Sequence, residues 1–283
     1  NKSDKVCILK PIGLSGYRDM SSLSYQSNVL KSKVYIPTGV FIDQKKNLYV
    51  ANYKSNNILE GTVNIKECEV HFTKEFSSMN TKGHENVSVD DKKNILVSAN
   101  YDAGTVTAFN LSDGKERWVT NIGQAHGVTI SDNKVYATGL TERKIYELGL
   151  DDGRVINSIG SIGWNPMKSQ FLWPTSIYPY NDNMLILSDP QSGFISFLDR
   201  QSLKTIKYTG GNGPSYYWFN YPYSAYPIKD QIIILSSQRG NILFLDSSGT
   251  VVEKSLISFK DNWPKFNYLD HDFGAGWNSY INV

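Results

Sequence analysis

Residues 37–52 read PTGVFIDQKKNLYVAN, and the pattern of this stretch returns four more times along the chain. Each copy has a short apolar strand, a polar turn and a second, more hydrophobic strand. The second strands contain NLYVAN, NILVSAN, KVYAT, MLILSD and IIILSS. The equivalent positions 40, 87, 128, 177 and 225 are 47, 41, 49 and 48 residues apart. A period of this size, built from strands and turns, predicts a radial repeat of small sheets.

A third and a fourth strand complete each repeat. Third strands read VTAF, IYEL, FISFL and ILFL, and the turns before them are rich in residues that tolerate tight or left-handed backbone. Four strands in a meander make one blade of a β-propeller, and no long amphipathic helix is evident. The sequence therefore predicts an all-β fold, a six-bladed β-propeller of four-stranded antiparallel blades, with residues 1–283 forming a single domain.

The sixth blade is expected to use both ends of the chain. The tripeptide FNY at 219–221 recurs one period later at 266–268, so residues 266–283 begin a last blade. Residues 5–30, approximately, then supply its remaining strands. Closure by N- and C-terminal strands removes the free edge that a ring of sheets would otherwise leave.

Isolated aspartates recur at fixed places in the repeats. They stand at strand ends and turns, where a carboxylate accepts hydrogen bonds from nearby backbone N–H groups. We therefore expect them to cap turns rather than to act as catalytic acids. They are Asp43, Asp90, Asp189 and Asp199.

The first copy of the repeat carries a resemblance to a known family. Its motif, Pro-x-Gly-Val-x-x-Asp followed by Asn-Leu-Tyr-Val-Ala-Asn, resembles the NHL repeat of six-bladed propellers. The match is good over residues 37–60, fair in the next two blades and only skeletal afterwards. Related propellers include lactonases, lyases and binding scaffolds, so the resemblance implies the fold more strongly than the function.

Polar residues at the starts of the first strands are candidate metal ligands. Histidines and carboxylates that converge from different strands have the composition of a divalent metal site, and the ion would be Ca²⁺ or Zn²⁺. The candidates are Glu85, Asn86, His126, Asp270, His271 and Asp272. The alternative is that these side chains line a narrow, wet channel and hold only water.

The family resemblance gives these candidates two precedents. The peptide-amidating lyase propeller places histidines at such positions as zinc ligands, and AHG at 125–127 and DHD at 270–272 match that register. His84 lies one residue out of it. Gluconolactonase-like propellers instead hold calcium with Glu, Asn and Asp, which Glu85, Asn86 and Asp270 or Asp272 would supply.

Aromatic residues gather in the long connections between blades. Exposed Trp and Tyr beside polar residues suit stacking on sugars or gripping a peptide. The candidates are Trp164, Trp173, Tyr217, Trp218, Tyr223 and Trp263. The alternative is that they fold inward and pack between blades.

Composition bounds the remaining options. The net charge is +2, so no basic excess points to nucleic acid, and no apolar run is long enough to span a membrane. Cys7 and Cys68 either form a disulfide or remain two buried thiols. The start at Asn1, the option of that disulfide and the richness in Tyr, Asn and Trp favour a periplasmic, cell-surface or secreted protein.

Two functions remain open. The first is an extracytoplasmic binding propeller that recognises a glycan, peptide or protein partner through its aromatic loops. The second is a metal-dependent hydrolase or lyase acting at the central channel, where the ion would lower the pKa of a bound water. No complete catalytic motif is present to favour the second.

Closure by both termini has a direct test. Deleting residues 1–12 should lower the melting temperature of the whole domain, because the last blade would lose a strand and reopen an edge. Thermal unfolding of the full and truncated chains checks this. Unchanged melting would contradict the closure.

Overall fold

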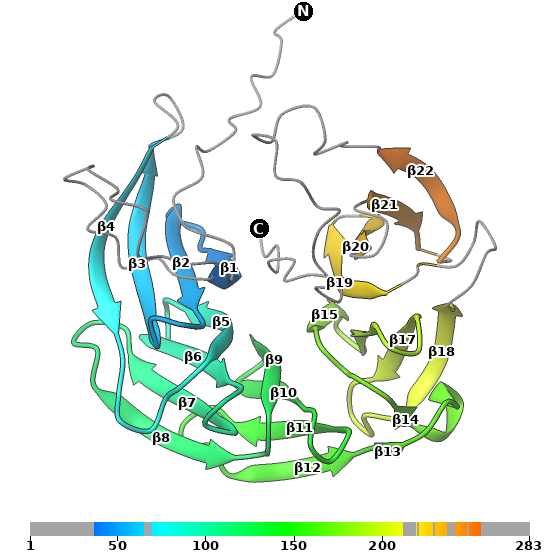
Figure 1. Cartoon of the computed structure of the whole chain (residues 1–283), viewed down its shortest axis with the longest axis horizontal. Coiled ribbons are helices and arrows are strands. Elements are labelled where there is room, and N and C mark those ends of the chain that lie inside the picture. The colour runs from blue at the N-terminus through cyan, green and yellow to red at the C-terminus, as the bar shows by residue number, and fades with distance from the viewer. Residues whose placement is uncertain are drawn as a thin grey trace, which may run out of the picture.

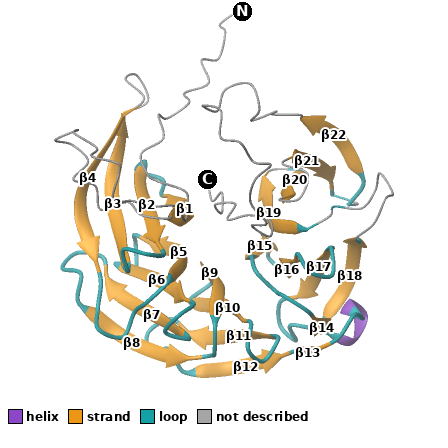
Figure 2. Cartoon of the chain, viewed as in Figure 1, coloured by secondary structure: helices purple, strands orange, loops and turns teal. Residues whose placement is uncertain are grey.

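The computed structural model describes residues 37–64, 69–211, 219, 221–228, 230–236, 241–247 and 249–255. These residues form an all-β propeller, in which five four-stranded antiparallel sheets are arranged around a ring (Figure 1). Figure 2 shows that strands dominate and that the helical content of the described residues is one short 3-10 turn. The predicted fold class is therefore confirmed as a β-propeller.

The five blades follow one another along the chain. Blade 1 contains β1 (Pro37–Ile42), β2 (Asn47–Asn52), β3 (Asn57–Asn64) and β4 (Glu69–Phe76). Blade 2 contains β5 (His84–Asp90), β6 (Ile95–Asn100), β7 (Thr105–Asn110) and β8 (Glu116–Asn121). Blade 3 contains β9 (Ala125–Ser131), β10 (Lys134–Gly139), β11 (Lys144–Gly149) and β12 (Val155–Ile159). Blade 4 contains β15 (Ile177–Asn181), β16 (Met184–Asp189), β17 (Phe194–Asp199) and β18 (Thr205–Gly210). Blade 5 contains β19 (Pro222–Ile228), β20 (Gln231–Ser236), β21 (Asn241–Asp246) and β22 (Val251–Ser255).

The blade count differs from the sequence prediction of six. The described residues form five blades. The strands expected to make the sixth, in residues 5–30 and 266–283, lie outside the described residues, as do Cys7 and Cys68. A further unforeseen element separates blades 3 and 4, where β13 (Ser161–Ile162) and β14 (Gln170–Phe171) pair in parallel around the 3-10 turn η2 (Pro166–Lys168).

Among the described residues, four hydrophobic clusters lie between neighbouring blades and one lies on blade 1 alone. The second strands are the most deeply buried, and every residue of β6 is buried. One cluster joins Tyr49 and Phe76 of blade 1 to Val87 and Phe109 of blade 2, and similar clusters join the later pairs of blades. Each such fully buried side chain contributes roughly 1.5–3 kcal/mol. Outer strands such as β8 and β12 are largely exposed.

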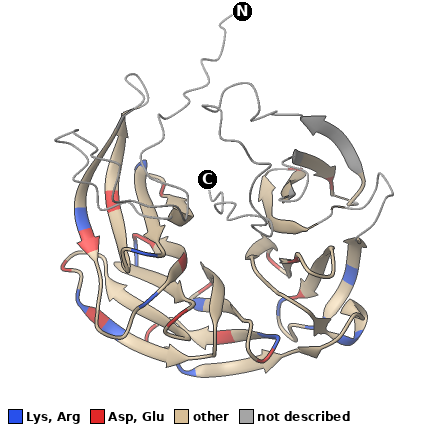
Figure 3. Ribbon diagram, in the orientation of Figure 1, with Lys and Arg blue, Asp and Glu red and all other residues tan. Residues whose placement is uncertain are grey.

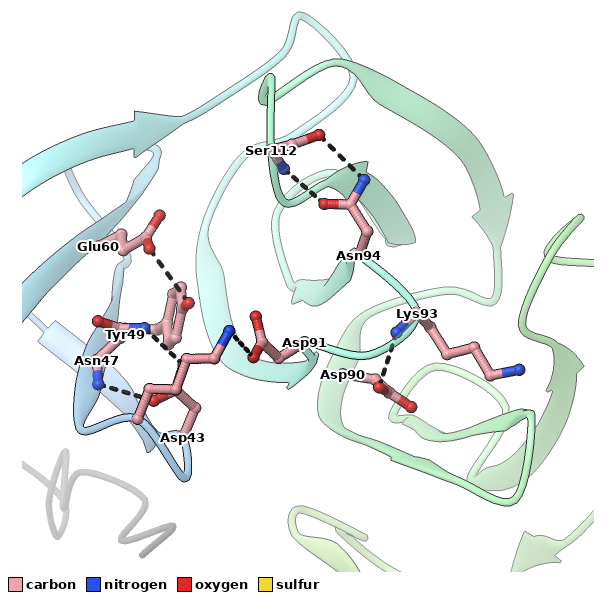
Figure 4. A network of polar contacts seen from close by, with 10 residues as sticks. Asp43, Asn47, Tyr49, Glu60, Asp90, Asp91, Lys93, Asn94 and Ser112 are labelled. Carbon is pink, nitrogen blue, oxygen red and sulfur yellow. Dashed lines mark hydrogen bonds and ion pairs between the residues drawn. The ribbon is translucent and has the colours of Figure 1, made fainter.

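Turns at the ends of the first strands are capped by their own side chains, as Figure 4 shows. Asp43 accepts hydrogen bonds from the backbone and side-chain nitrogens of Asn47, each at 2.8 Å. Lys45 forms an ion pair with Asp91 in the next blade, with 2.5 Å between its Nζ atom and Oδ2 of Asp91. Asp90 and Asp199 likewise accept bonds from backbone N–H groups three residues on. The expectation that these aspartates cap turns is confirmed.

Hydroxyl groups join each described blade to the one after it. Thr38 donates to the carbonyl of His84 at 2.7 Å, and Ser88 accepts from the backbone of Ile130 at 3.1 Å. The next two joints are made in the same way, by Thr138 to Thr175 at 3.0 Å and by Thr175 to Tyr223 at 2.8 Å. In every one of these bonds the side chain belongs to the earlier blade and the backbone group to the later one.

The same joints bring backbones so close that a side chain would not fit. A Cβ at Gly39 would lie 2.6 Å from the carbonyl oxygen of Glu85. A Cβ at Gly127 would overlap the carbonyl oxygen of Thr175. Glycine is thus required on these first strands by close approach between blades.

This close approach predicts a difference between two glycines of blade 3. Gly127→Ala should lower the free energy of unfolding by about 3 kcal/mol, because backbone must move to make room. Gly149→Ala is the matched control, since its new methyl would meet only the end of the Asp152 side chain. Chemical denaturation of both variants checks this. Equal losses would show that the joint between blades 3 and 4 is not tight.

Candidate binding site at the channel mouth

The meander brings two kinds of position to one face of the ring. In each blade, the start of the first strand and the turn between the second and third strands lie at the same end of the sheet. We call this end the mouth face. Six side chains from these positions interact there and are called the mouth cluster: Tyr53, Glu85, Tyr101, Asp102, His126 and Tyr223.

Aromatic rings of the mouth cluster form an arc across four blades. The rings of Tyr53 and Tyr101 lie 6.4 Å apart, and those of Tyr101 and His126 lie 6.1 Å apart in an edge-on arrangement. His126 then meets Tyr223 at 5.5 Å, with its Nε2 atom 3.0 Å from the tyrosine hydroxyl. These spacings are those of favourable aromatic pairs. The arc therefore fixes side chains of blades 1, 2, 3 and 5 relative to one another.

Two carboxyl groups lie beside this arc. Glu85, on β5, is 1% exposed, and its Oε2 atom has no hydrogen-bond partner among the described residues. Asp102 is exposed and accepts a hydrogen bond of 2.7 Å from the Tyr53 hydroxyl. Burial, with the nearby charge of Asp102, raises the pKa of Glu85 to about 8. Burial, with the charges of Glu85 and Asp102, also raises the pKa of Tyr101.

The histidines of this face are buried and uncharged. His126 is 2% exposed, and burial lowers its pKa to about 3. Burial lowers the pKa of His84 to about 4, although the Asn56 carbonyl and the Asn100 side chain lie near its ring. His126 therefore holds the tyrosine hydroxyl as a neutral imidazole and does not neutralise Glu85.

Only half of the predicted metal ligands fall within the described residues. Glu85, Asn86 and His126 are all buried at the mouth face, while residues 270–272 lie outside the described part of the chain. Within that part, no three His, Cys, Asp or Glu residues are grouped as a metal site requires. Asn86 lies near the Tyr178 hydroxyl instead. A channel metal stays a prediction.

The predicted aromatic ligands separate in the structure. Tyr223 joins the mouth cluster but is only 7% exposed, and Trp173 is partly buried just before the first strand of blade 4. Asp189 holds that segment by accepting bonds from the backbone nitrogens of Leu172 at 2.7 Å and Trp173 at 2.8 Å. Asp189 is thus also a cap, as expected. Tyr217, Trp218 and Trp263 lie outside the described residues.

Trp164 does not join the mouth cluster. It is 66% exposed between β13 and η2, and η2, in the same connecting segment, packs against β18, the outer strand of blade 4 (Figure 2). The segment packs there because Phe171, at its end, is buried in the core between blades 3 and 4. Trp164 therefore lies on the outer side of blade 4, which we call the outer rim, and its role in binding stays a prediction.

Sequence reasoning missed Tyr53, Tyr101 and Asp102. A signal for the two tyrosines was present, because Ala-Asn-Tyr occurs at 51–53 and again at 99–101, directly after second strands. Asn52 and Asn100 each bond to a residue five positions on, at 2.8 and 3.0 Å, which turns the chain at the same point. A residue repeated at a turn that the fold places at the mouth is a candidate for function.

Charges of both signs are interspersed around the ring (Figure 3). In the described ranges, no helix has the length and hydrophobicity needed to cross a bilayer.

The sequence matches no protein-family model and no curated protein. Solved structures are similar to it, and they are β-propellers. Streptogramin B lyase has a TM-score of 0.59 at 15% identity, over 77% of this chain and 68% of that one. The WD40 β-propeller domain of Doa1 has a TM-score of 0.56 at 13% identity, over 77% of this chain and 67% of that one. BamB from Moraxella catarrhalis has a TM-score of 0.50 at 14% identity, over 76% of this chain and 62% of that one.

At these identities the likeness shows the fold alone. This chain spans roughly two thirds of each of those proteins. The likeness supports a β-propeller without identifying the six-bladed NHL-repeat family among propellers.

The raised pKa of Glu85 predicts how stability depends on pH. In the unfolded chain the Glu85 carboxyl ionises near pH 4.5, whereas in the folded chain it ionises only near pH 8. The contribution of the protonated carboxyl to the free energy of unfolding is therefore full below pH 4.5 and is lost as the pH rises towards 8. Glu85→Gln should therefore melt at a progressively higher temperature than the native chain between pH 5 and 8. Thermal unfolding across that range checks this.

The control is Glu116→Gln, which changes an exposed carboxyl on β8. The buried histidines lose stability as pH falls below 6.5, but both proteins share that effect, so it cancels in the difference. Melting curves of the native chain and Glu85→Gln that stay parallel from pH 5 to 8 would contradict the burial of an unpartnered carboxyl.

Proposed function

We propose that this protein is an extracytoplasmic binding propeller that recognises a glycan, peptide or protein partner at its mouth face. One observation carries the proposal. Aromatic side chains from four blades converge beside Glu85, a buried carboxyl whose Oε2 atom has no hydrogen-bond partner among the described residues. Buried polar atoms without partners are rare in folded proteins and are found at functional sites.

The chemistry of the mouth cluster suits recognition. Tyrosine rings offer flat apolar faces with a polar edge, and they lose little conformational entropy when a ligand binds. The cluster is also held rigidly, because its members lie on strands or tight turns and bond to one another, as Tyr53 does to Asp102 and Tyr223 to His126. Preorganisation of this kind lowers the cost of binding.

The ring that presents this face is proposed to have six blades. The repeat spacing supports a sixth blade, made from residues 266–283 and approximately residues 5–30.

The alternative, a metal-dependent hydrolase or lyase at the channel, remains a prediction from the sequence. No contact among the described residues favours it over binding. The location outside the cytoplasm likewise depends on the richness in Tyr, Asn and Trp and on the option of a disulfide between Cys7 and Cys68.

Selection of ligands tests the proposal. Random displayed peptides and a glycan array are screened with the native chain, with Tyr101→Ala and with Tyr208→Ala. Tyr208 is the matched control, because it is an exposed tyrosine on the outer strand β18. We expect ligands enriched by the native chain to lose about tenfold in affinity on Tyr101→Ala and to bind Tyr208→Ala unchanged.

A further variant, Trp164→Ala, separates the mouth face from the outer rim. Its affinity should equal that of the native chain. Ligands that ignore Tyr101→Ala but lose affinity on Trp164→Ala would move the binding site to the outer rim, and a screen that enriches nothing would contradict the proposed function.

A further inference from the structure

We propose that the mouth cluster binds a positively charged side chain, arginine or lysine, presented by a peptide segment of the partner. This inference rests on the proposed function and names the chemistry of its ligand. It follows from three features of the cluster. Its two carboxyl groups form no ion pair among the described residues, its tyrosine rings can accept an ammonium group, and the neighbouring histidines are neutral.

Among the described residues, Glu85 lacks a hydrogen-bond donor to its Oε2 atom. Glu85 is 1% exposed, its Oε2 atom has no hydrogen-bond partner, and it forms no ion pair in the described part of the chain. Asp102 lies close enough to raise the pKa of Glu85 and is held in place by the Tyr53 hydroxyl. Two neighbouring carboxyl groups, one of them buried, are stabilised most by a ligand that brings N–H donors and positive charge together.

The tyrosine rings beside them are suited to the same ligand. Lys54 places its ammonium nitrogen 4.8 Å from the centre of the Tyr53 ring, so a ring of this cluster already accepts a cation in the free protein. Tyr101 is only partly buried, and its ring stands edge-on to His126. A guanidinium or ammonium group that contacts these rings and both carboxyls would gain cation–π attraction as well as charge-assisted hydrogen bonds.

The other groups around Glu85 do not supply a cation in the ligand's place. His126, on β9, is neutral and occupied with Tyr223, and His84, beside Glu85 on β5, is neutral as well. Arg143, in the turn after β10, donates to the carbonyl of Leu140 and affects the pKa of Tyr101 but not that of Glu85. The first strand β1 packs against Glu85 with Gly39, which carries no charge.

Calorimetric titration of the full chain tests the inference with small probes. N-acetyl-L-argininamide and N-acetyl-L-lysinamide are the cationic probes, and N-acetyl-L-citrullinamide is the neutral analogue of arginine with nearly the same shape. We expect the cationic probes to bind at about millimolar Kd, and citrullinamide about tenfold more weakly, since charged hydrogen bonds are the stronger ones.

Three variants complete the test. Glu85→Gln and Asp102→Asn should each weaken argininamide binding about tenfold. Asp113→Asn, an exposed turn carboxyl of the same blade, is the control and should change nothing. Because Glu85→Gln is expected to be at least as stable as the native chain at neutral pH, loss of binding in this variant cannot be attributed to unfolding. Asp102→Asn changes an exposed side chain, so loss of binding in this variant is a second test of the same site.

The outcomes that overturn the inference are distinct from those that overturn the proposed function. Equal binding of citrullinamide, unchanged binding in both carboxyl variants, or no binding of either cationic probe would each overturn it, and the last would leave a water-filled site. Selected ligands that depend on Tyr101 yet carry no arginine or lysine would overturn this inference while the proposed function stands. Ligands that ignore Tyr101 would overturn both.

Discussion

The described blades depend on one kind of contact, in which a side-chain hydroxyl bonds to the backbone of the next blade. Thr38, Ser88, Thr138 and Thr175 make these bonds at the four joints between the five blades. The bonds require backbones to approach closely, and that approach excludes a Cβ at Gly39 and Gly127. The apolar clusters between blades supply most of the stabilisation, while these short polar contacts fix the angle at which one blade meets the next.

The same contacts place the mouth cluster. Thr38 donates its hydrogen bond to the carbonyl of His84, and Glu85 follows His84 in the chain. Thr175 donates to the carbonyl of Tyr223, whose hydroxyl is hydrogen-bonded to His126. The joint therefore buries Glu85. At a pH above the ordinary pKa of a glutamate, keeping this carboxyl buried lowers the stability of the fold. A residue that a fold retains at such a cost is better explained by binding than by packing.

The sequence predicted the fold much more completely than it predicted the site. Strands and turns followed from periodicity, and Asp43 and Asp90 cap turns because carboxylates bond to nearby backbone, which is a local effect. The site required knowing which side chains meet across blades, and that depends on ring closure and twist rather than on local pattern. Trp164 shows the limit: its exposure was foreseeable, but its position on the outer rim follows from the burial of Phe171 between blades.

The hydroxyl bonds give the ring a direction, because each joint takes its side chain from the earlier blade and its backbone group from the later one. During synthesis on the ribosome, a newly made blade would carry hydroxyls whose partners have not yet been translated. Each of these joints can therefore form only once the backbone of the later blade has been made.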